Sequence, residues 1–305
     1  MLLDAASLYF RAFYGVPTTV TAPDGRPINA VRGFLDMTAR LLTAHGPDRL
    51  VACWDDDWRP AFRVEVLPSY KAHRVPTGGG EEVPDELARQ VPILVDVLAA
   101  AGIARVGAPG YEADDVIGTL ATRARGPVDI VTGDRDLFQL VDDERRIRVL
   151  YTNRGIADIE SVDEAAVAGR YGIPGRGYAD FAVLRGDPSD GLPGVTGVGA
   201  KTAAALIEEF GDLAGIRAAA ARTVVAKPPL TAAVLKKLHA AGDYLDRAPA
   251  VVAVVTDIDL PAVEGALPSS PADGIALAEL SARHGLQSSL SRLGAALGWP
   301  SGALG

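Results

Sequence analysis

Short apolar runs alternate with longer amphipathic segments along the first half of the chain. The apolar runs have the length of buried strands and lie at residues 1–5, 49–55, 103–107, 128–134 and 147–151. Segments with apolar positions at helical spacing lie between several of them, at 29–46, 86–102 and 115–126. Strands that alternate with helices of this length predict a mainly parallel central sheet with helices on both faces. The predicted fold class is therefore α/β.

The pattern changes near residue 166, after which the sequence predicts a mainly helical region. Helices are expected near 229–243 and around 275–298, with an apolar strand at 250–255 between them. Before this change, the segment 69–87 is first basic, then Gly-rich and then acidic. Such a segment predicts a mobile loop with little helix.

Aspartates follow three of the predicted strands. Asp4 ends the first strand, Asp55 ends the second, and Asp134 and Asp136 follow the fourth. A single aspartate after a strand is ordinarily a solvated turn residue, but the carboxyl ends of parallel strands meet at one edge of a sheet. Like charges gathered there repel one another unless cations neutralise them.

Three further acids, Glu112, Asp114 and Asp115, stand at the start of an apolar helical pattern. Helix capping alone explains such a triplet, because acids in a first turn accept hydrogen bonds from free N–H groups and face the positive end of the helix dipole. On a helix, Glu112 and Asp115 share a face. Asp114 would point elsewhere, so the three carboxylates converge on one point only if Glu112 lies just before the regular turns of the helix. Together with the strand-end aspartates, the triplet also fits one wall of a metal site.

Composition restricts the ligands available to a metal. The 305 residues are 48% hydrophobic and 23% charged, which suits a soluble globular protein of one large domain or two joined ones. A single cysteine, Cys53, and only four histidines argue against a disulfide and a zinc cluster, so oxygen ligands are expected. Asp4 interrupts the apolar N-terminus and no run is long enough for a membrane span. A cytoplasmic protein without signal peptide or membrane anchor is predicted.

The net charge of −9 argues at first against nucleic acid as a partner, because nucleic-acid binding usually needs a basic surface. If nine carboxylates surround metal ions, however, the remaining 30 acids balance the 30 lysines and arginines. Bound cations also reverse the local sign of the potential. The charge therefore permits nucleic-acid binding without showing it.

The segment GLPGVTGVGAKTAAALI, residues 191–207, allows three readings of its glycines. A phosphate-binding P-loop fails because one residue separates Gly199 from Lys201, although Gly194 is correctly spaced. A dinucleotide fingerprint fails because Thr202 stands where the third glycine belongs after Gly197 and Gly199. A helix–hairpin–helix fits better, since its Gly-rich turn presents N–H groups to a DNA phosphate and Lys201 adds a charge. An ordinary loop before an Ala-rich helix is the structural alternative.

The sequence GDPSDG precedes this segment and carries Asp187 and Asp190. All its residue types favour a turn, which explains it in isolation. Its two carboxylates would also complete a second metal site.

Five motifs, in order and spacing, resemble the bacterial 5′-nuclease family: LLDAASLYFRAFYG, CWDDDWRPAFRVEVLPSYKAHR, GYEADDVIG, VTGDRDLFQLV and LRGDPSDGLPGVTGVGAKTA. That family includes the 5′→3′ exonuclease domain of DNA polymerase I, phage flap endonucleases and eukaryotic flap endonucleases. The resemblance runs from residue 2 to beyond 255 and implies a stand-alone member without a polymerase domain. It implies a PIN-like catalytic domain at 1–165 with a helical arch at about 69–95, a helix–hairpin–helix region at 166–260 and a C-terminal helical extension at 261–305 packed on the core.

The resemblance implies two divalent ions, Mg²⁺ or Mn²⁺, held in two groups of carboxylates. The first group is Asp4, Asp55, Glu112, Asp114 and Asp115, and the second is Asp134, Asp136, Asp187 and Asp190. Because Mg²⁺ keeps several waters, Asp115 and Asp190 are expected to act through water. Relatives also hold K⁺ in the hairpin, and the Gly-rich turn here can present converging carbonyl groups to such an ion.

The resemblance also implies contacts with the substrate. Lys71 and Arg74 match the base of the arch, where basic residues contact the scissile phosphate, and Arg63 is a further phosphate-contact candidate. Tyr70 matches an aromatic residue that stacks on a base, and the hairpin contacts DNA through Gly194, Gly197, Gly199, Lys201 and Thr202. On the residues alone, Tyr70 would be a partly buried anchor and Lys71 a solvated side chain.

Three features depart from the family pattern. Ala5 replaces a glycine, Asp56 and Asp57 add acids near the expected metals, and a short arch with Gly78, Gly79 and Gly80 predicts a flexible segment.

The predicted function is that of a monomeric, structure-dependent 5′-nuclease with 5′→3′ exonuclease and 5′-flap endonuclease activity. It would hydrolyse phosphodiesters at DNA flaps, nicks, 5′ overhangs and RNA–DNA junctions by two-metal catalysis, in replication, repair and RNA-primer removal. A non-catalytic DNA-structure binder and an RNA-directed nuclease remain open. So does an Asp-dependent phosphohydrolase, suggested by the DRD sequence, although Phe138 stands where such enzymes have Thr or Val.

Overall fold

A computed structural model describes residues 1–75, 83–222, 227–300 and 302 of the chain. Its centre is a six-stranded sheet with the strand order β3-β2-β1-β4-β5-β6. The strands are β1 (Leu2–Asp4), β2 (Val51–Cys53), β3 (Ala104–Val106), β4 (Val128–Thr132), β5 (Ile147–Tyr151) and β6 (Glu160–Val162). The first five are parallel and β6 is antiparallel to β5. The predicted α/β class and five predicted strands are confirmed, whereas β6 was not predicted.

Alternate residues of the strands enter two separate hydrophobic cores, one on each face of the sheet. Leu3, Val131 and Leu150 belong to the core that contains residues of α2 (Asn29–His45) and α4 (Asp85–Ala101). Leu2 and Ile130 belong to the other, with residues of α5 (Ala113–Arg123) and α7 (Tyr178–Arg185). This period of two explains why the strands are apolar throughout: both faces are buried.

The strand order reverses between β1 and β4, and this arrangement positions the site. In an open parallel sheet, the crevice beyond the carboxyl ends of strands at such a switch point is the usual ligand site. Asp4 is the last residue of β1 and the N-cap of α1 (Ala5–Gly15), where its side chain accepts a hydrogen bond from the Ser7 N–H group. The chain therefore turns sharply from strand to helix at an acid.

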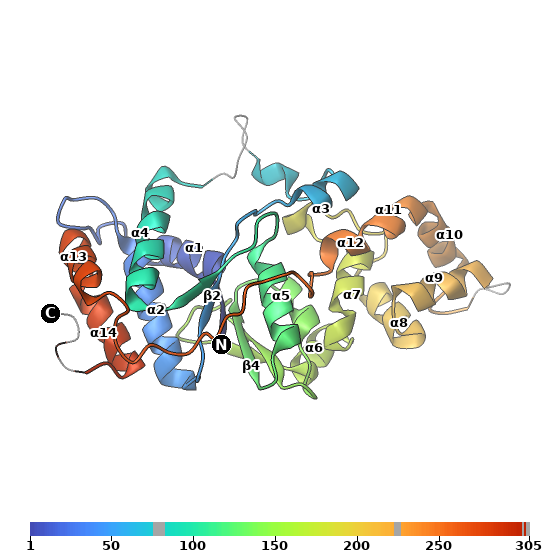
Figure 1. Cartoon of the computed structure of the whole chain (residues 1–305). Coiled ribbons are helices and arrows are strands. Elements are labelled where there is room, and N and C mark those ends of the chain that lie inside the picture. Colours follow the sequence, from blue (N-terminus) through green and yellow to red (C-terminus); the bar gives the residue numbers. More distant parts are fainter. Residues whose placement is uncertain (76–82, 223–226, 301, 303–305) are drawn as a thin grey trace.

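The second half of the chain is mainly helical, as expected. It contains the helices α6 (Glu164–Tyr171), α7, α8 (Ala200–Phe210), α9 (Leu213–Arg222), α10 (Ala232–Ala240), α11 (Gly242–Arg247) and α12 (Pro249–Val252). Figure 1 shows α8, α9 and α10 at the end of the molecule opposite α13 (Gly274–His284) and α14 (Gln287–Leu297).

The prediction of a strand at 250–255 is wrong. Residues 249–252 form α12, because a proline favours the first turn of a helix and a short apolar run does not distinguish strand from helix. The backbone N–H groups of the residues that follow donate to side chains and not to a neighbouring strand. Val254 N–H donates to Gln139 Oε1 at 3.0 Å, and Val255 N–H donates to Asp115 Oδ1 at 2.8 Å.

The C-terminal helices α13 and α14 lie beside α4 and α2 (Figure 1). One helical pattern was predicted at 275–298, but Gly285 adopts a left-handed φ of 66° and divides it into two helices. Arg292 of α14 forms an ion pair of 2.8 Å with Asp36 of α2. None of the helices in the described ranges is long and apolar enough to cross a membrane.

The expected arch is described in part. It follows α3 (Ala61–Val66) and contains a 3₁₀ turn, η1 (Ala72–Arg74), and the first part of α4, which begins at Asp85. Gly78, Gly79 and Gly80, on which the prediction of a flexible arch rests, lie outside the described residues.

Candidate active site

A pocket of about 250 Å³ opens at the carboxyl edge of the sheet, beside the ends of β1, β2 and β4. Its acidic side chains come from four separate segments and are Asp4, Asp55, Glu112, Asp114 and Asp134. We call it the acidic pocket. Three of these acids follow strands, as the sequence pattern predicted, and the start of α5 supplies the other two.

On the β1–β4 side, the Thr132 hydroxyl links two of the acids. It donates to Asp4 Oδ2 at 2.7 Å and accepts from the Asp134 N–H group at 2.9 Å. Burial, and then the charge of Asp55, raise the pKa of Asp4 to about 7. Thr132 was not predicted as a site residue, although a hydroxyl at the last strand position before an acid was a readable signal in VTGD.

On the β2 side, the carboxylates surround the start of α5. Asp55 Oδ1 accepts from the Ala113 N–H group at 2.6 Å, and burial raises the pKa of Asp55. Glu112 is the N-cap and so precedes the regular turns, the condition under which the sequence allowed it to approach Asp114. Burial, followed by the charges of Asp134 and Asp4, raises the pKa of Asp114 well above its ordinary value.

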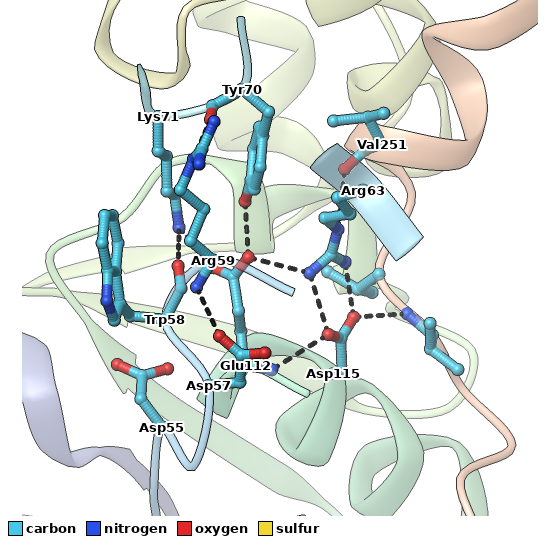
Figure 2. A network of polar contacts seen from close by, with 12 residues as sticks. Asp55, Asp57, Trp58, Arg59, Arg63, Tyr70, Lys71, Glu112, Asp115 and Val251 are labelled. Carbon is cyan, nitrogen blue, oxygen red and sulfur yellow. Dashed lines mark hydrogen bonds and ion pairs between the residues drawn. The ribbon is translucent and has the colours of Figure 1, made fainter. Parts of the chain in front are cut away.

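Glu112 is held by side chains from the segment that includes α3 and the residues after it (Figure 2). Its Oε1 atom accepts hydrogen bonds from the Tyr70 hydroxyl at 2.6 Å and from Arg63 Nη1 at 3.0 Å. Its Oε2 atom pairs with Lys71 Nζ, which also lies 3.4 Å from the Trp58 carbonyl oxygen. These contacts fix the Glu112 carboxylate beside a cation that itself lines the acidic pocket.

Arg63 does not lie where the sequence predicted. It is only 2% exposed, and its Nη1 and Nη2 atoms donate to the two oxygens of Asp115 at 2.9 and 2.6 Å. Its Nε atom donates to the Val251 carbonyl at 3.0 Å. A guanidinium whose donors are engaged inside the protein does not present itself to a substrate phosphate, so the geometry corrects the predicted role of Arg63.

Asp115 is also turned away from the acidic pocket. It is fully buried, and besides Arg63 its oxygens accept from the N–H groups of Glu112 at 3.2 Å and Val255 at 2.8 Å. These contacts use its four acceptor positions, which leaves none for a metal ion or its water. Successive residues of a helix point about 100° apart, so Asp114 lines the pocket while Asp115 faces Arg63. The predicted metal contact of Asp115 is therefore corrected.

Tyr70 and Lys71 are both buried, with 4% and 8% exposure. Tyr70 is the anchor that the residues alone favoured, because its hydroxyl is engaged by Glu112; stacking on a base does not fit this position. Lys71 is not a solvated side chain. Burial acts to lower its pKa, but the charge of Glu112 opposes this, and the pKa lies well above its ordinary value. Its backbone has a left-handed φ of 48°, a conformation that non-glycine residues rarely adopt.

Asp136, Asp187 and Asp190, the rest of the predicted second group, lie outside the acidic pocket lining but influence it. Burial, then Asp134, Asp190 and Asp187, raise the pKa of Asp136 well above its ordinary value. Burial also raises the pKa of Asp190 to about 6, against the opposing charge of Lys71.

Two of these acids have local cationic partners. Asp190 Oδ1 pairs with Arg74 Nη2 at 3.1 Å, and Asp187 Oδ2 pairs with Arg185 Nη2 at 3.1 Å.

The turn that carries Asp190 is docked on the base of the arch. The Lys71 N–H group donates to the Asp190 carbonyl at 3.0 Å. Gly191 approaches Ser69 so closely that a Cβ atom would lie 2.2 Å from its carbonyl oxygen. Only glycine fits there, and the close approach fixes Arg74 and Lys71 next to the second acidic group.

The extra acids of the second motif stay outside the acidic pocket. Asp57 Oδ1 accepts from the Arg59 N–H group at 3.1 Å (Figure 2). Asp56 lies against Gly107, where a Cβ atom would come within 2.4 Å of Asp56 Oδ1.

The Gly-rich segment forms a turn that leads into α8. Gly194 and Gly197 have left-handed φ values of 67° and 77°. Lys201 is exposed in the first turn of α8, whereas Thr202 is half-buried and Gly199 is the N-cap. The Gly197 carbonyl accepts a hydrogen bond from Lys237 Nζ of α10 at 2.7 Å, a contact that the sequence did not predict.

Family models match almost the whole chain. The model of the 5′-3′ exonuclease N-terminal resolvase-like domain matches residues 1–172, and that of the 5′-3′ exonuclease C-terminal SAM fold matches residues 173–274. The chain belongs to the 5′-3′ exonuclease family. A 5′-3′ exonuclease of Streptomyces coelicolor is 61% identical over 298 residues, covering 96% of this chain and 98% of that protein. A 5′-3′ exonuclease of Mycobacterium tuberculosis is 53% identical, covering 97% of each.

A solved structure supports the fold of this 5′-3′ exonuclease family member. The flap endonuclease of bacteriophage T5, in a complex with DNA and metal ions, matches with a TM-score of 0.62 at 16% identity. The match covers 97% of this chain and 98% of the phage protein. The family models confirm the family predicted from the motifs, and the likeness to the solved structure supports the predicted PIN-like fold.

The donor set of this family member suits hard divalent ions. In the described part of the chain, no three acidic, His or Cys side chains stand close enough together to hold an ion without rearrangement. Glu112 and Asp190 are instead paired with Lys71 and Arg74. The acidic pocket nevertheless offers carboxylate oxygens, which Mg²⁺ and Mn²⁺ prefer. Burial, followed by the charges of neighbouring acids, raises the pKa of Asp4 and Asp114, and a bound cation would favour their ionised forms.

Proposed function

We propose that this chain is a divalent-metal-dependent, structure-dependent 5′-nuclease that hydrolyses phosphodiesters in DNA with a free 5′ end. The observation that carries the proposal is the acidic pocket, in which five carboxylates from four segments converge beside Lys71 and Arg74. Membership of the 5′-3′ exonuclease family supports it. The complex of the phage T5 flap endonuclease with DNA and metal ions supports DNA as the partner.

The first ion would be held by acids of the acidic pocket, Asp4, Asp55, Glu112 and Asp114, and the second by Asp134 with Asp136, Asp187 and Asp190. Bound divalent ions lower the pKa of a water molecule and neutralise the charge that develops on phosphoryl oxygens. Thr132 orients Asp4 and the backbone before Asp134, so it contributes to holding both acids in place. Asp115 is not included, because Arg63 and two backbone N–H groups already engage it.

Lys71 and Arg74 would stabilise the reacting phosphate. Both line the acidic pocket, and Lys71 is fixed there by Glu112 and by its backbone bond to the Asp190 carbonyl. A cation that is already oriented before the reaction stabilises developing negative charge without reorganisation. Arg63 would act one step removed, by holding Glu112 in the position at which it meets Lys71.

The hairpin at 194–202 would hold the duplex. Its exposed Lys201 and the N–H groups at the start of α8 suit phosphate contacts that ignore base sequence. The K⁺ ion proposed for this hairpin would have to share or replace the contact that Lys237 makes with the Gly197 carbonyl. The proposed substrates are 5′ flaps, nicks, 5′ overhangs and RNA–DNA junctions, cleaved by a monomer in replication and repair.

Product mapping on 5′-labelled DNA tests this function. A flap duplex, a blunt duplex and a single strand are each incubated with Mg²⁺, Mn²⁺ or EDTA. Cleavage near the flap junction or at the 5′ end that needs a metal ion is expected. Asp134→Asn is expected to abolish it. The matched control is Asp129→Asn, which removes an acid of the preceding strand β4 that pairs with Arg148 of β5. Cleavage that survives EDTA or Asp134→Asn would contradict the proposal, and so would DNA binding without cleavage or turnover of small phosphate esters alone.

A further inference from the structure

A second cavity, of about 670 Å³, lies next to the acidic pocket. The two share Arg74, Gly133 and Asp134 in their linings, so they meet at the loop after β4. The second cavity is lined by four arginines and two tyrosines: Arg74, Arg135, Arg154, Arg170, Tyr151 and Tyr171. We call it the basic pocket. Nothing in the proposed metal chemistry uses the three arginines that lie outside the acidic pocket.

The basic pocket carries an excess of positive charge. Against its four guanidinium groups, the acids in its lining are Asp134 and Glu160. Arg135 is 44% exposed and lies 4.0 Å from Asp187, a separation that leaves most of its donors free for a ligand. A patch of this sign, in an acidic chain and directly beside the acids proposed to hold metal, suits a ligand that carries both phosphate and a reacting bond.

Two of the arginines are held in place by the protein. Arg170 pairs with Glu160, and its guanidinium carbon lies 6.0 Å from the ring centroids of both Phe138 and Tyr171. Arg74 donates to the Ser189 carbonyl at 2.7 Å and reaches Asp190. Such anchoring reduces the side-chain entropy that is lost when a ligand binds.

Arg154 is not anchored in this way, since its side chain is mostly exposed. Its guanidinium lies 3.6 Å from the Asp158 carboxylate, in an ion pair whose side chains are 78% and 70% exposed. Exposed ion pairs of this kind are weak and exchange readily for a stronger partner. A phosphate, which accepts two parallel hydrogen bonds from a guanidinium, is such a partner.

We propose that the basic pocket binds a phosphate group of the cleaved strand next to the scissile phosphodiester. This inference rests on the proposed nuclease function and adds to it a subsite that positions the strand. The volume lies within the range of about 300–1,000 Å³ found for ligand pockets and is large enough for a nucleotide. Tyr151 and Tyr171 also line the pocket, and arginines recognise phosphate without reading sequence.

Binding and cleavage by charge-neutralised variants test the inference. Arg154→Gln, Arg170→Gln and the double variant are compared with wild type on a 5′-flap duplex. Arg292→Gln is the matched control, because it removes a partly exposed arginine that pairs with Asp36 and lines neither pocket. Thermal melts confirm that each variant is folded, and Arg170→Lys retains the charge if loss of the Glu160 pair weakens the fold.

Each single variant is expected to weaken DNA binding roughly fivefold to tenfold and to lower the slope of log Kd against log salt by about one. In cleavage, the loss is expected mainly in KM. If the variants behave like Arg292→Gln, the proposal that the basic pocket binds phosphate is wrong, while the proposed nuclease function is unaffected. A wild-type protein that cleaves no 5′-ended DNA would instead contradict the proposed function itself.

Modified substrates identify which phosphate is bound. One series carries a single neutral methylphosphonate at successive linkages beside the cleavage site, and another carries a 5′-phosphate or a 5′-hydroxyl. We expect one modification to weaken DNA binding by the wild type. On that modified substrate, the wild type and the double variant should bind equally. If that modification is a methylphosphonate, the ligand is an internal phosphodiester; if it is the 5′-hydroxyl, the ligand is the terminal phosphate. Equal effects of every modification on wild type and double variant would exclude a phosphate subsite here.

Discussion

Arg63 of α3 and Asp115 of α5 form a buried two-pronged ion pair, with Nη1–Oδ2 and Nη2–Oδ1 distances of 2.9 and 2.6 Å. The same guanidinium donates to Glu112, so one buried arginine connects a structural acid with an acid of the proposed metal site. The pair also joins α3 to the extended segment after α12, because Asp115 accepts from the Val255 N–H group. Residues that are 52 positions apart thereby hold the wall of the acidic pocket.

Removing the arginine is expected to destabilise the protein strongly. Arg63→Met would leave Asp115 buried without its charged partner, and breaking a buried pair in this way costs about 3–5 kcal/mol. Urea denaturation at neutral pH measures the change. The control is Arg148→Met, which breaks the partly exposed pair with Asp129 and is expected to cost less than about 1 kcal/mol. Equal losses for the two variants would mean that the buried pair contributes nothing specific.

Asp114 and Asp115 are neighbours with opposite expected behaviour. Asp114→Asn removes an acid of the acidic pocket, so Mn²⁺ binding and cleavage are expected to fall by at least about 100-fold while the fold is kept. Asp115→Asn loses its charged pairing with Arg63 and is expected to lower the free energy of unfolding, with the metal concentration needed for half-maximal cleavage little changed. Titrating Mn²⁺ into both variants and following cleavage distinguishes them. The Mn²⁺ concentration needed for half-maximal cleavage should change less in Asp115→Asn than in Asp114→Asn. The reverse order would support the metal-binding role of Asp115 that was predicted from the sequence.

The sequence predicted the acids of the pocket better than the residues that support them. Strand ends are readable from apolar runs, and parallel strands bring their carboxyl ends together, so Asp4, Asp55 and Asp134 could be assigned to one edge. The roles of Asp114 and Asp115 depend on helix phase, which differs by about 100° between neighbours. A pattern of three acids in four positions does not resolve that phase.

Burial of polar residues was the main feature that the sequence could not supply. Arg63 and Lys71 are basic residues for which the sequence predicted exposed positions, yet both are buried because Glu112 supplies a partner from a distant segment. The strand predicted at 250–255 failed for a related reason. Its apolar residues are buried, but their backbone partners are the side chains of Gln139 and Asp115 and not a strand.

Tyr70→Phe distinguishes an anchor from a base-stacking residue. Phenylalanine keeps an aromatic ring but removes the hydroxyl that donates to Glu112, a hydrogen bond to a charged group worth about 1.5–3 kcal/mol. We expect reduced stability and slower cleavage, with little change in the Kd for flap DNA. A stacking residue would behave in the opposite way, since Phe would preserve its activity and Tyr70→Leu would weaken binding. Fluorescence binding assays and single-turnover cleavage on the two variants give the answer.

The buried acids of the pocket predict an unusual dependence of stability on pH in metal-free protein. The pKa of Asp4 is about 7 in the folded protein, against an ordinary value of 3.8. A carboxyl group with a raised folded-state pKa holds its proton more tightly in the native state, so its contribution to stability is full below pH 3.8 and is lost as pH rises toward 7. In EDTA, Asp4 alone is expected to lower the free energy of unfolding by about 2–3 kcal/mol between pH 5 and pH 7.

Asp4→Asn isolates this contribution from other titrating groups. The amide retains an oxygen that can accept from the Ser7 N–H group but carries no charge, so the variant is expected to be the more stable protein at pH 7 and to lose the share of the pH dependence that Asp4 contributes. Saturating Mn²⁺ should remove the same dependence from the wild type, because a cation favours the ionised carboxylate. Thermal or urea unfolding at pH 5, 6 and 7, with EDTA or Mn²⁺, measures all of these. A wild type that becomes more stable from pH 5 to pH 7 in EDTA, or an Asp4→Asn variant with an unchanged slope, would show that Asp4 is not the buried, charge-strained acid described above.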